Sequence, residues 1–167
     1  MIVTYSIMQT IKPISANNRT KFEVMSQEVE DYYLPKYLGD AFAYDVQTNP
    51  SDYADLLDGV EFEDCDGNTV KFKGLKYVLA YFIYAEYIVE TKYADTYTGM
   101  VTKNREEASS ITKGQEEQLK NKYRSYAESQ VDLMRKYLNE NSDTYELWNR
   151  STPRAYNPIF TNVKRIK

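Results

Sequence analysis

The apolar run LKYVLAYFIYAEYIV, at residues 75 to 89, constrains the fold more than any other part of the sequence. Its aliphatic and aromatic side chains fall on nearly every side of a helix, so other elements must enclose that helix. The run is shorter than the roughly 20 residues that cross a bilayer, and it contains Lys76, Glu86 and four tyrosines. We therefore expect residues 75 to 92, released from the preceding chain by Gly74, to form the central helix of a helical bundle.

A second long helix is expected over residues 113 to 140. Thr112 and Gln115 have the spacing of a capping box at its start. One side of the helix carries Lys, Glu, Asp and Arg, a charge pattern typical of solvated helix surface. The other side is marked by Leu119, Tyr123, Tyr126, Ala127, Gln130, Val131, Met134, Tyr137 and Leu138.

The N-terminal part of the sequence predicts a helix over residues 16 to 34. Phe22, Met25 and Val29 recur at helical spacing and belong to one apolar stripe. Pro35 should end or kink this helix just before it, because proline lacks a backbone N–H and crowds the preceding turn.

Two short helices should follow, each marked by residues that start or stop helices. Gly39 can end the first helix, and Asp40 can cap the next one. Asn49 can cap another helix, with Pro50 at its first position and Gly59 at its close.

Residues 60 to 73 change from helical to alternating periodicity, which predicts a β-hairpin. Valine and phenylalanine alternate with glutamate before the turn and with lysine after it. The turn itself is Asp66-Gly67-Asn68, a favourable sequence for a tight reversal of the chain. Opposite charges should therefore face each other on the outer side of the hairpin.

The acidic turn also raises the possibility of a calcium loop, because Asp64, Asp66 and Asn68 are spaced two residues apart. A calcium loop needs glycine at its sixth position and a bidentate glutamate at its twelfth. Thr69 and Leu75 occupy those positions. We therefore expect no calcium site.

The 167 residues suit one domain with one hydrophobic core. We expect a single helical domain over residues 1–140 and a C-terminal tail over residues 141–167 that serves as a contact segment. The tail shows little periodicity but contains Trp148, Tyr156 and Phe160. Such a segment should pack on something, either its own subunit or another.

Most catalytic and metal sites need residues that this chain lacks. It has no histidine, the commonest base and transition-metal ligand near neutral pH. Its one cysteine, Cys65, has no partner for a disulfide and no histidine to activate it. No GxGxxG, P-loop or GxSxG motif is present, and the paired acids lie on surfaces expected to be wet. We therefore expect a protein that is not an enzyme and that needs no cofactor or metal.

The net charge of −4 and the pI of about 5.0 argue against a dedicated nucleic-acid binder, which needs cationic surface. Lys164, Arg165 and Lys167 form a short basic segment, although such segments are more often solvated than binding. The N-terminal residues have no basic leader and an interrupted apolar stretch, unlike a signal peptide. We expect the protein in the cytoplasm of its host cell or in a particle assembled there.

The order of several motifs resembles a known family. The sequence contains IKPISANN, then LPKYLGDAFAYDV, YADLLDG, the hairpin, FKGLKYVLAYFIYAEYI and TYTGMVTKNREEASSI. This layout, from about residue 10 to 140, is similar to the head-tail connector proteins of tailed phages, also called adaptors or neck rings, of the Bacteroides phage and crAss-like type. LGDA at 38 to 41, the GLKYVLAYFIYAEYI helix and TGMVTKN are its most specific parts.

The resemblance implies a mainly helical virion structural protein. Members of the family assemble as homo-oligomeric rings, typically dodecamers, that dock beneath the portal protein. They extend the channel through which DNA passes without specific binding, and they present a platform for further neck or tail proteins. The implied location is the neck of the virion, with assembly in the host cytoplasm and no membrane partner.

The segment TYTGMVTKNREEASSIT, at residues 96 to 112, is expected to be a long inter-helix loop that reaches a neighbouring subunit or ring. The alternative is that it folds back on its own subunit. The 17 tyrosines suit half-exposed interfaces, but a compositional bias of the source genome explains them equally well. The interface candidates are Tyr97, Thr98, Gly99, Met100, Val101 and Lys103 in the loop, and Trp148, Tyr156 and Phe160 in the tail, where Trp148 could equally belong to the core.

Two other functions remain open at this stage. One is a small helical regulatory or nucleic-acid-associated protein whose basic C-terminal segment touches phosphate. The other is an enzyme of an unfamiliar type. Salt-dependent DNA binding by the isolated protein would favour the first of these.

Overall fold

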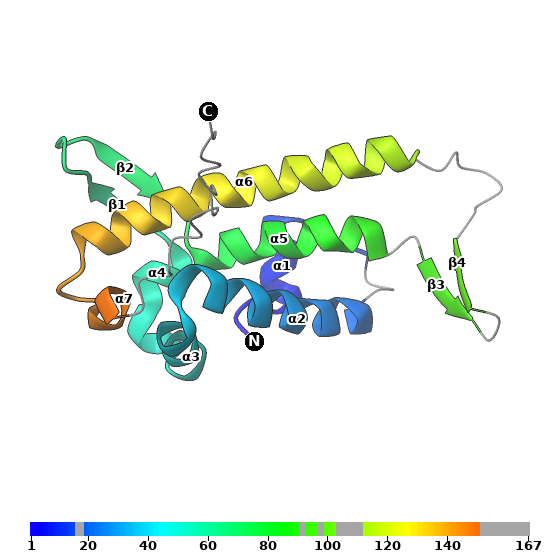
Figure 1. Cartoon of the computed structure of the whole chain (residues 1–167), viewed down its shortest axis with the longest axis horizontal. Coiled ribbons are helices and arrows are strands. Elements are labelled where there is room, and N and C mark those ends of the chain that lie inside the picture. The colour runs from blue at the N-terminus through cyan, green and yellow to red at the C-terminus, as the bar shows by residue number, and fades with distance from the viewer. Residues whose placement is uncertain (16–18, 91–92, 97–98, 103–111, 151–167) are drawn as a thin grey trace, which may run out of the picture.

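The chain is mainly α-helical, as the sequence predicts, and two long antiparallel helices form its centre (Figure 1). The computed structural model describes residues 1–15, 19–90, 93–96, 99–102 and 112–150. Its elements are α1 (Tyr5–Ile11), α2 (Arg19–Leu38), α3 (Asp40–Thr48), η2 (Pro50–Tyr53), α4 (Ala54–Asp58), β1 (Val60–Glu63), β2 (Thr69–Phe72), α5 (Leu75–Glu90), β3 (Tyr93–Thr96), β4 (Gly99–Thr102), α6 (Lys113–Glu140) and α7 (Glu146–Arg150).

Helix α5 lies between α2 and α6 and runs antiparallel to both, as Figure 1 shows. Its buried side chains come from several sides of the helix, which confirms the central position that the apolar run predicts. Phe82 of α5 stacks on Tyr33 of α2 with 3.9 Å between the ring centroids. The predicted capping box of α6 is also present, since Gln115 N–H donates to Thr112 Oγ1 and Thr112 N–H donates to Gln115 Oε1.

Helix α2 differs from its prediction at the C-terminal end. It continues through Pro35 to Leu38 and ends at Gly39, whose φ of 82° suits glycine. Proline is tolerated here because it costs only one hydrogen bond near the end of a helix whose buried face supplies most of its stability. Tyr37 and Leu38, which lie beyond the proline, are both buried in the core.

Helix α1 is a second difference, because the sequence pattern gave no prediction for it. Thr4 caps this helix by accepting a hydrogen bond from the N–H of Ile7 at 3.3 Å. A seven-residue helix is too short for periodicity to reveal. Its Met8 is fully buried, so packing on the larger helices accounts for its formation.

The short helices form where expected, but their capping differs. Asp40 is the first residue of α3 rather than its cap, and Gly39 takes the cap position. Asn49 precedes the 3₁₀ turn η2 without capping it, since its side-chain amide donates instead to Asp45 at 2.8 Å. Pro50 and Gly59 hold the predicted positions at the start of η2 and the end of α4.

The predicted hairpin at residues 60–73 is confirmed by the antiparallel pairing of β1 with β2. Val60 pairs with Phe72 across the strands, and Glu61 pairs with Lys71, whose side chains form an ion pair at 2.9 Å. The apolar face of the hairpin packs on α6, where Tyr137 lies 5.4 Å from the ring of Phe62.

The segment between α5 and α6 contains a second hairpin that the sequence analysis missed. Strands β3 and β4 pair in antiparallel register, with Ala94 opposite Val101 and Asp95 opposite Met100. Only Tyr97 and Thr98 separate the strands, and neither is a residue that marks a tight hairpin turn. The expected inter-helix loop over residues 96–112 therefore includes strand residues at Thr96 and at Gly99–Thr102.

Residues 141–150, the first part of the expected C-terminal contact segment, pack on the helical body of their own subunit. Tyr145 and Trp148 are buried in the core, and the Tyr145 and Tyr137 hydroxyl groups share a hydrogen bond of 2.9 Å. The Trp148 indole N–H donates to Asn139 at 2.8 Å. These contacts fasten α7 to the end of α6.

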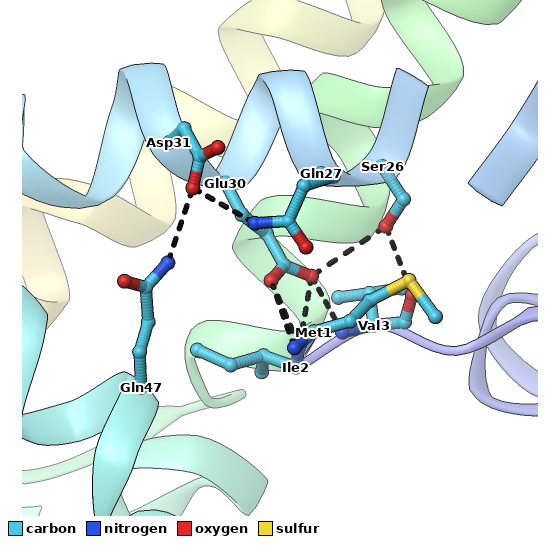
Figure 2. A network of polar contacts seen from close by, with 8 residues as sticks. All are labelled: Met1, Ile2, Val3, Ser26, Gln27, Glu30, Asp31 and Gln47. Atoms are coloured by element: carbon cyan, nitrogen blue, oxygen red, sulfur yellow. Dashed lines mark hydrogen bonds and ion pairs between the residues drawn. The ribbon is translucent and has the colours of Figure 1, made fainter. Parts of the chain in front are cut away.

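A buried carboxylate ties the first residues of the chain to α2 (Figure 2). Glu30 accepts hydrogen bonds from the N–H groups of Ile2 and Val3 at 2.8 to 2.9 Å, and its side chain is fully buried. Ser26 Oγ donates to the Val3 carbonyl at 2.9 Å. Burial raises the pKa of Glu30, and the hydrogen bonds donated by Val3, Ile2 and Ser26 oppose that rise.

Candidate interaction surfaces

The described part of the chain offers no metal centre. It holds no group of three or more histidine, cysteine, aspartate or glutamate side chains arranged to bind a metal ion. The Asp64 carboxylate accepts the N–H groups of Asn68 and Asp66 at 2.9 and 3.1 Å, so it closes its own turn. The Asn68 hydrogen bond is the main reason that the pKa of Asp64 is lowered. Cys65 is exposed beside this turn.

No helix within the described ranges has both the length and the apolar character required to cross a membrane.

Six tyrosines form a strip along α5 and α6, which we call the tyrosine strip. Adjacent rings lie 4.5 Å apart for Tyr77 and Tyr81, and 4.8 Å apart for Tyr84 and Tyr123. Most of these rings are half-buried, so apolar ring surface reaches the solvent boundary along both helices. The members are Tyr77, Tyr81, Tyr84 and Tyr87 of α5 and Tyr123 and Tyr126 of α6.

Lysine ammonium groups cover parts of the tyrosine strip. Lys12 Nζ lies 4.8 Å from the ring centre of Tyr123 and 5.0 Å from that of Tyr84. Lys73 Nζ lies 4.6 Å from the ring centre of Tyr77. At these distances the ammonium groups form cation–π interactions with the exposed faces of the rings. Burial raises the pKa of Tyr84 above its ordinary value.

A groove lies between α2 and α6 over the C-terminal half of α5, and we call it the acidic groove. Its volume is about 360 Å³, and it opens to solvent. Three of its four charged residues are glutamates. The lining residues are Met25, Glu28, Val29, Tyr32 and Tyr33 from α2, Glu86 and Glu90 from α5, and Arg124 from α6.

The charges of the acidic groove are only partly compensated. Glu86 forms an ion pair with Lys120 at 2.6 Å, and the Arg124 guanidinium donates to the Tyr33 hydroxyl at 2.9 Å. The carboxylates of Glu28 and Glu90 have no hydrogen-bond or ion-pair partner among the described residues. Within the described part of the chain, the carboxylates of Glu28 and Glu90 are therefore exposed to solvent without an ion-pair partner.

Apolar surface adjoins these charges. The side chains of Tyr32 and Val24 are 62% and 59% exposed, although both residue types usually favour at least partial burial. Lys36 Nζ lies 5.9 Å from the ring centre of Tyr32, and the ring of Tyr33 contacts it edge to face at 4.9 Å between centroids. The rim of the groove thus combines an exposed aromatic ring with carboxylates.

The interface candidates from the sequence fall into three groups. Gly99, Met100 and Val101 lie in strand β4. Trp148 is a core residue with 7% exposure, so it is not available to a partner and the core alternative holds for it. Tyr97, Thr98, Lys103, Tyr156 and Phe160 lie outside the described residues.

The tyrosine strip and the acidic groove were both missed by sequence reasoning. The strip had a detectable signal, because Tyr77, Tyr81, Tyr84 and Tyr87 recur at spacings of four, three and three, which is one face of a helix. The groove had none. It depends on how α2 and α6 sit beside α5, and no local pattern encodes that arrangement.

The two hairpins lie at opposite ends of the long axis in Figure 1. The β1–β2 hairpin packs on the C-terminal half of α6, whereas the β3–β4 hairpin stands beyond the end of α5. Each sheet has two strands, so each strand leaves one edge without a strand partner among the described residues. Open strand edges are ready to pair with another strand.

Comparisons with known proteins gave one match. A family model described as a family of unknown function, DUF6712, matches residues 34–158. The search of curated proteins found no match, and the search of solved structures found none either.

Proposed function

The chain belongs to the DUF6712 family, whose function is unknown, and from its surfaces we propose that it is a virion structural protein that forms a ring where the portal of a tailed phage meets the tail. The ring is a homo-oligomer, a dodecamer by the resemblance to phage connectors. It extends the DNA channel and serves as a docking platform for further neck or tail proteins. Its place is the neck of the virion, with assembly in the host cytoplasm.

The position of the β3–β4 hairpin is the observation that carries this proposal. The hairpin connects α5 to α6 yet lies apart from the helical body, at the end opposite β1–β2 (Figure 1). Each of its strands has only four residues. An isolated two-stranded hairpin is at best marginally stable in water. Contact with a neighbouring subunit would supply the missing support.

Contacts made at opposite ends of a subunit favour rings. If a surface at one end of a copy binds a different surface of the next copy, the interface is heterologous, and a suitable rotation closes the assembly. Pairing of a strand with an open sheet edge is a common way to build such a contact. The two hairpins offer open edges at both ends of the molecule.

The tyrosine strip also suits a protein that binds other proteins. Tyrosine is enriched at interfaces because it combines a large apolar face with a polar tip. The acidic composition is compatible with a channel through which DNA passes without being held, since phosphate binding needs cationic surface. We propose no catalytic role, and neither of the buried carboxyl groups among the described residues, Glu30 and Glu116, lines the acidic groove.

Electron microscopy of the protein alone and after mixing with its portal protein tests the proposal. We expect closed rings, at least in the presence of the portal, seated coaxially on it. A chain that stays monomeric at high concentration and does not bind the portal would overturn the ring. Salt-dependent DNA binding combined with that result would favour a nucleic-acid-associated protein instead.

A linker exchange tests the role of the hairpin. Replacing residues 97–104 by a Gly/Ser sequence of equal length keeps α5 and α6 connected but replaces all of β4. We expect helicity to be retained and ring assembly to be lost. Replacing residues 105–109 in the same way is the matched control and should leave assembly intact. Unchanged assembly after the 97–104 exchange would exclude the hairpin as the contact.

A further inference from the structure

The acidic groove and the C-terminal segment of the chain have opposite charges. The carboxylates of Glu28 and Glu90 stand at the groove without a hydrogen-bond or ion-pair partner among the described residues, and Lys21 Nζ donates to the backbone carbonyl of Glu90 at 3.3 Å. Residues 151–167 contain four basic residues and no acidic one. We propose that residues 151–167 of a neighbouring copy dock in the acidic groove. This inference rests on the proposed function, since the ring supplies the neighbouring copy.

The apolar character of the two surfaces also matches. Beside its carboxylates the groove has Met25 and Val29 in its wall and the exposed ring of Tyr32 at its rim. The segment contains Tyr156 and Phe160 among its apolar residues. Aromatic rings of this kind anchor interfaces when a pocket receives them, and basic residues then add charge complementarity around them.

The electrostatics of the groove favour a neighbouring copy over the segment's own subunit. Helix α7 ends at Arg150 beside α3, at the end of the helical body opposite the C-terminal end of α5 (Figure 1). The half of α2 and α6 nearest to α7 carries Lys36 and Arg135, both close to the ring of Tyr37, although Asp132 forms an ion pair with Arg135 at 3.4 Å. A basic segment running back along its own subunit would pass these cations. A segment from a neighbour can enter at the acidic end directly.

Charge reversal followed by mixing tests the proposal in the full chain. The groove variant is Glu28→Lys with Glu90→Lys, and the tail variant is Lys164→Glu, Arg165→Glu and Lys167→Glu. We expect each variant alone to weaken association between copies by about tenfold or more, because like charges then face each other. An equimolar mixture should restore association, since each tail finds an opposite groove. Sedimentation velocity measures the masses, and Glu63→Lys with Glu140→Lys is the matched charge control.

Several outcomes would overturn the inference. If the two sets of changes restore association only when combined in one chain, the segment docks in its own subunit. If the groove variant behaves like the control variant, the segment binds elsewhere.

A labelled synthetic peptide of residues 151–167 separates this inference from the ring itself. Titrated with the full chain at concentrations where that chain is monomeric, the peptide should bind, lose affinity in the groove variant and lose affinity as salt is added. Peptide binding without any ring on the portal would support the groove contact and overturn the ring. Rings without peptide binding would overturn the groove contact and leave the ring standing.

Discussion

The carboxylate of Glu30 accepts the backbone N–H of Ile2 although the two residues are 28 positions apart in the sequence. The same carboxylate accepts the N–H of Val3, so one buried side chain satisfies two backbone donors that water cannot reach. In this way α2 holds the segment that leads into α1. A charge inside the core is retained here because it has hydrogen-bond donors on both oxygen atoms.

Replacing Glu30 should destabilise the protein in a graded manner. Glu30→Ala leaves two buried N–H groups unpaired, which should lower the free energy of unfolding by about 3 kcal/mol. Glu30→Gln keeps one acceptor oxygen and should cost less. Chemical denaturation followed by circular dichroism measures both losses. Glu28→Ala, two residues earlier and exposed, is the control and should change stability little; an equal loss there would contradict the role of Glu30.

Gly74 should not tolerate a side chain. Its φ is +92°, and an added Cβ would lie 2.5 Å from the Leu57 carbonyl oxygen. Gly74→Ala should therefore cost about 3 kcal/mol or more, through strain and a clash with backbone that cannot move away. Gly114→Ala is the matched control, because that helical position has open space around it. It should gain about 0.5–1 kcal/mol. Thermal unfolding of the two variants measures the difference, and similar melting temperatures would contradict the prediction.

The buried tyrosines should make stability fall at alkaline pH. Burial and the carboxylate of Asp45 raise the pKa of Tyr53 to about 12, and burial raises the pKa values of Tyr37 and Tyr145 as well. Above about pH 10 the unfolded chain releases tyrosine protons that the folded chain retains. The folded state then binds more protons, so the free energy of unfolding decreases as pH rises.

Denaturation at a series of pH values, with tyrosinate absorbance recorded in parallel, measures this slope. Tyr53→Phe should make the slope above pH 10 less steep, because it removes one of the groups whose pKa differs between the two states. Asp45→Asn should act in the same direction, since the charge that holds the Tyr53 proton is gone. A slope identical to that of the wild type in both variants would contradict the assignment.

Trp148 should be required for the stability of the folded chain. Its side chain is buried and its indole N–H is paired with Asn139. Trp148→Ala should lower the free energy of unfolding by about 3–5 kcal/mol, through lost burial and the cavity that remains. Tyr44→Ala, at a side chain that is 71% exposed, is the control and should change stability little. Trp148 is the only tryptophan, so a red shift of its fluorescence on unfolding provides an independent check.

The elements that could be predicted from the sequence are those whose signals are local. The apolar run predicted α5, the Thr112–Gln115 pair predicted the start of α6, and alternating residues predicted the β1–β2 hairpin. In each case neighbouring residues in the chain carry the pattern. Periodicity and capping therefore sufficed.

Other features could be seen only in the tertiary structure, because they depend on contacts between residues that are distant in the sequence. Helix α2 passes Pro35 because Tyr37 and Leu38 are buried against the rest of the core, and that burial outweighs one lost hydrogen bond. The β3–β4 hairpin lacks the turn residues that would have signalled it. Trp148, a candidate contact residue in the sequence, is buried in the core, where its indole N–H donates to Asn139.

The sequence by itself determined that the protein is mainly helical, which helix is central and which residue types it lacks for chemistry. Only the tertiary structure decided where the surfaces lie. The acidic groove forms because α2, α5 and α6 lie side by side. The hydrogen bond between Glu30 and the Ile2 N–H joins residues 28 positions apart. The physical reason is that secondary structure follows from patterns repeated every few residues, whereas a groove or a buried ion depends on contacts between segments that are remote in the chain.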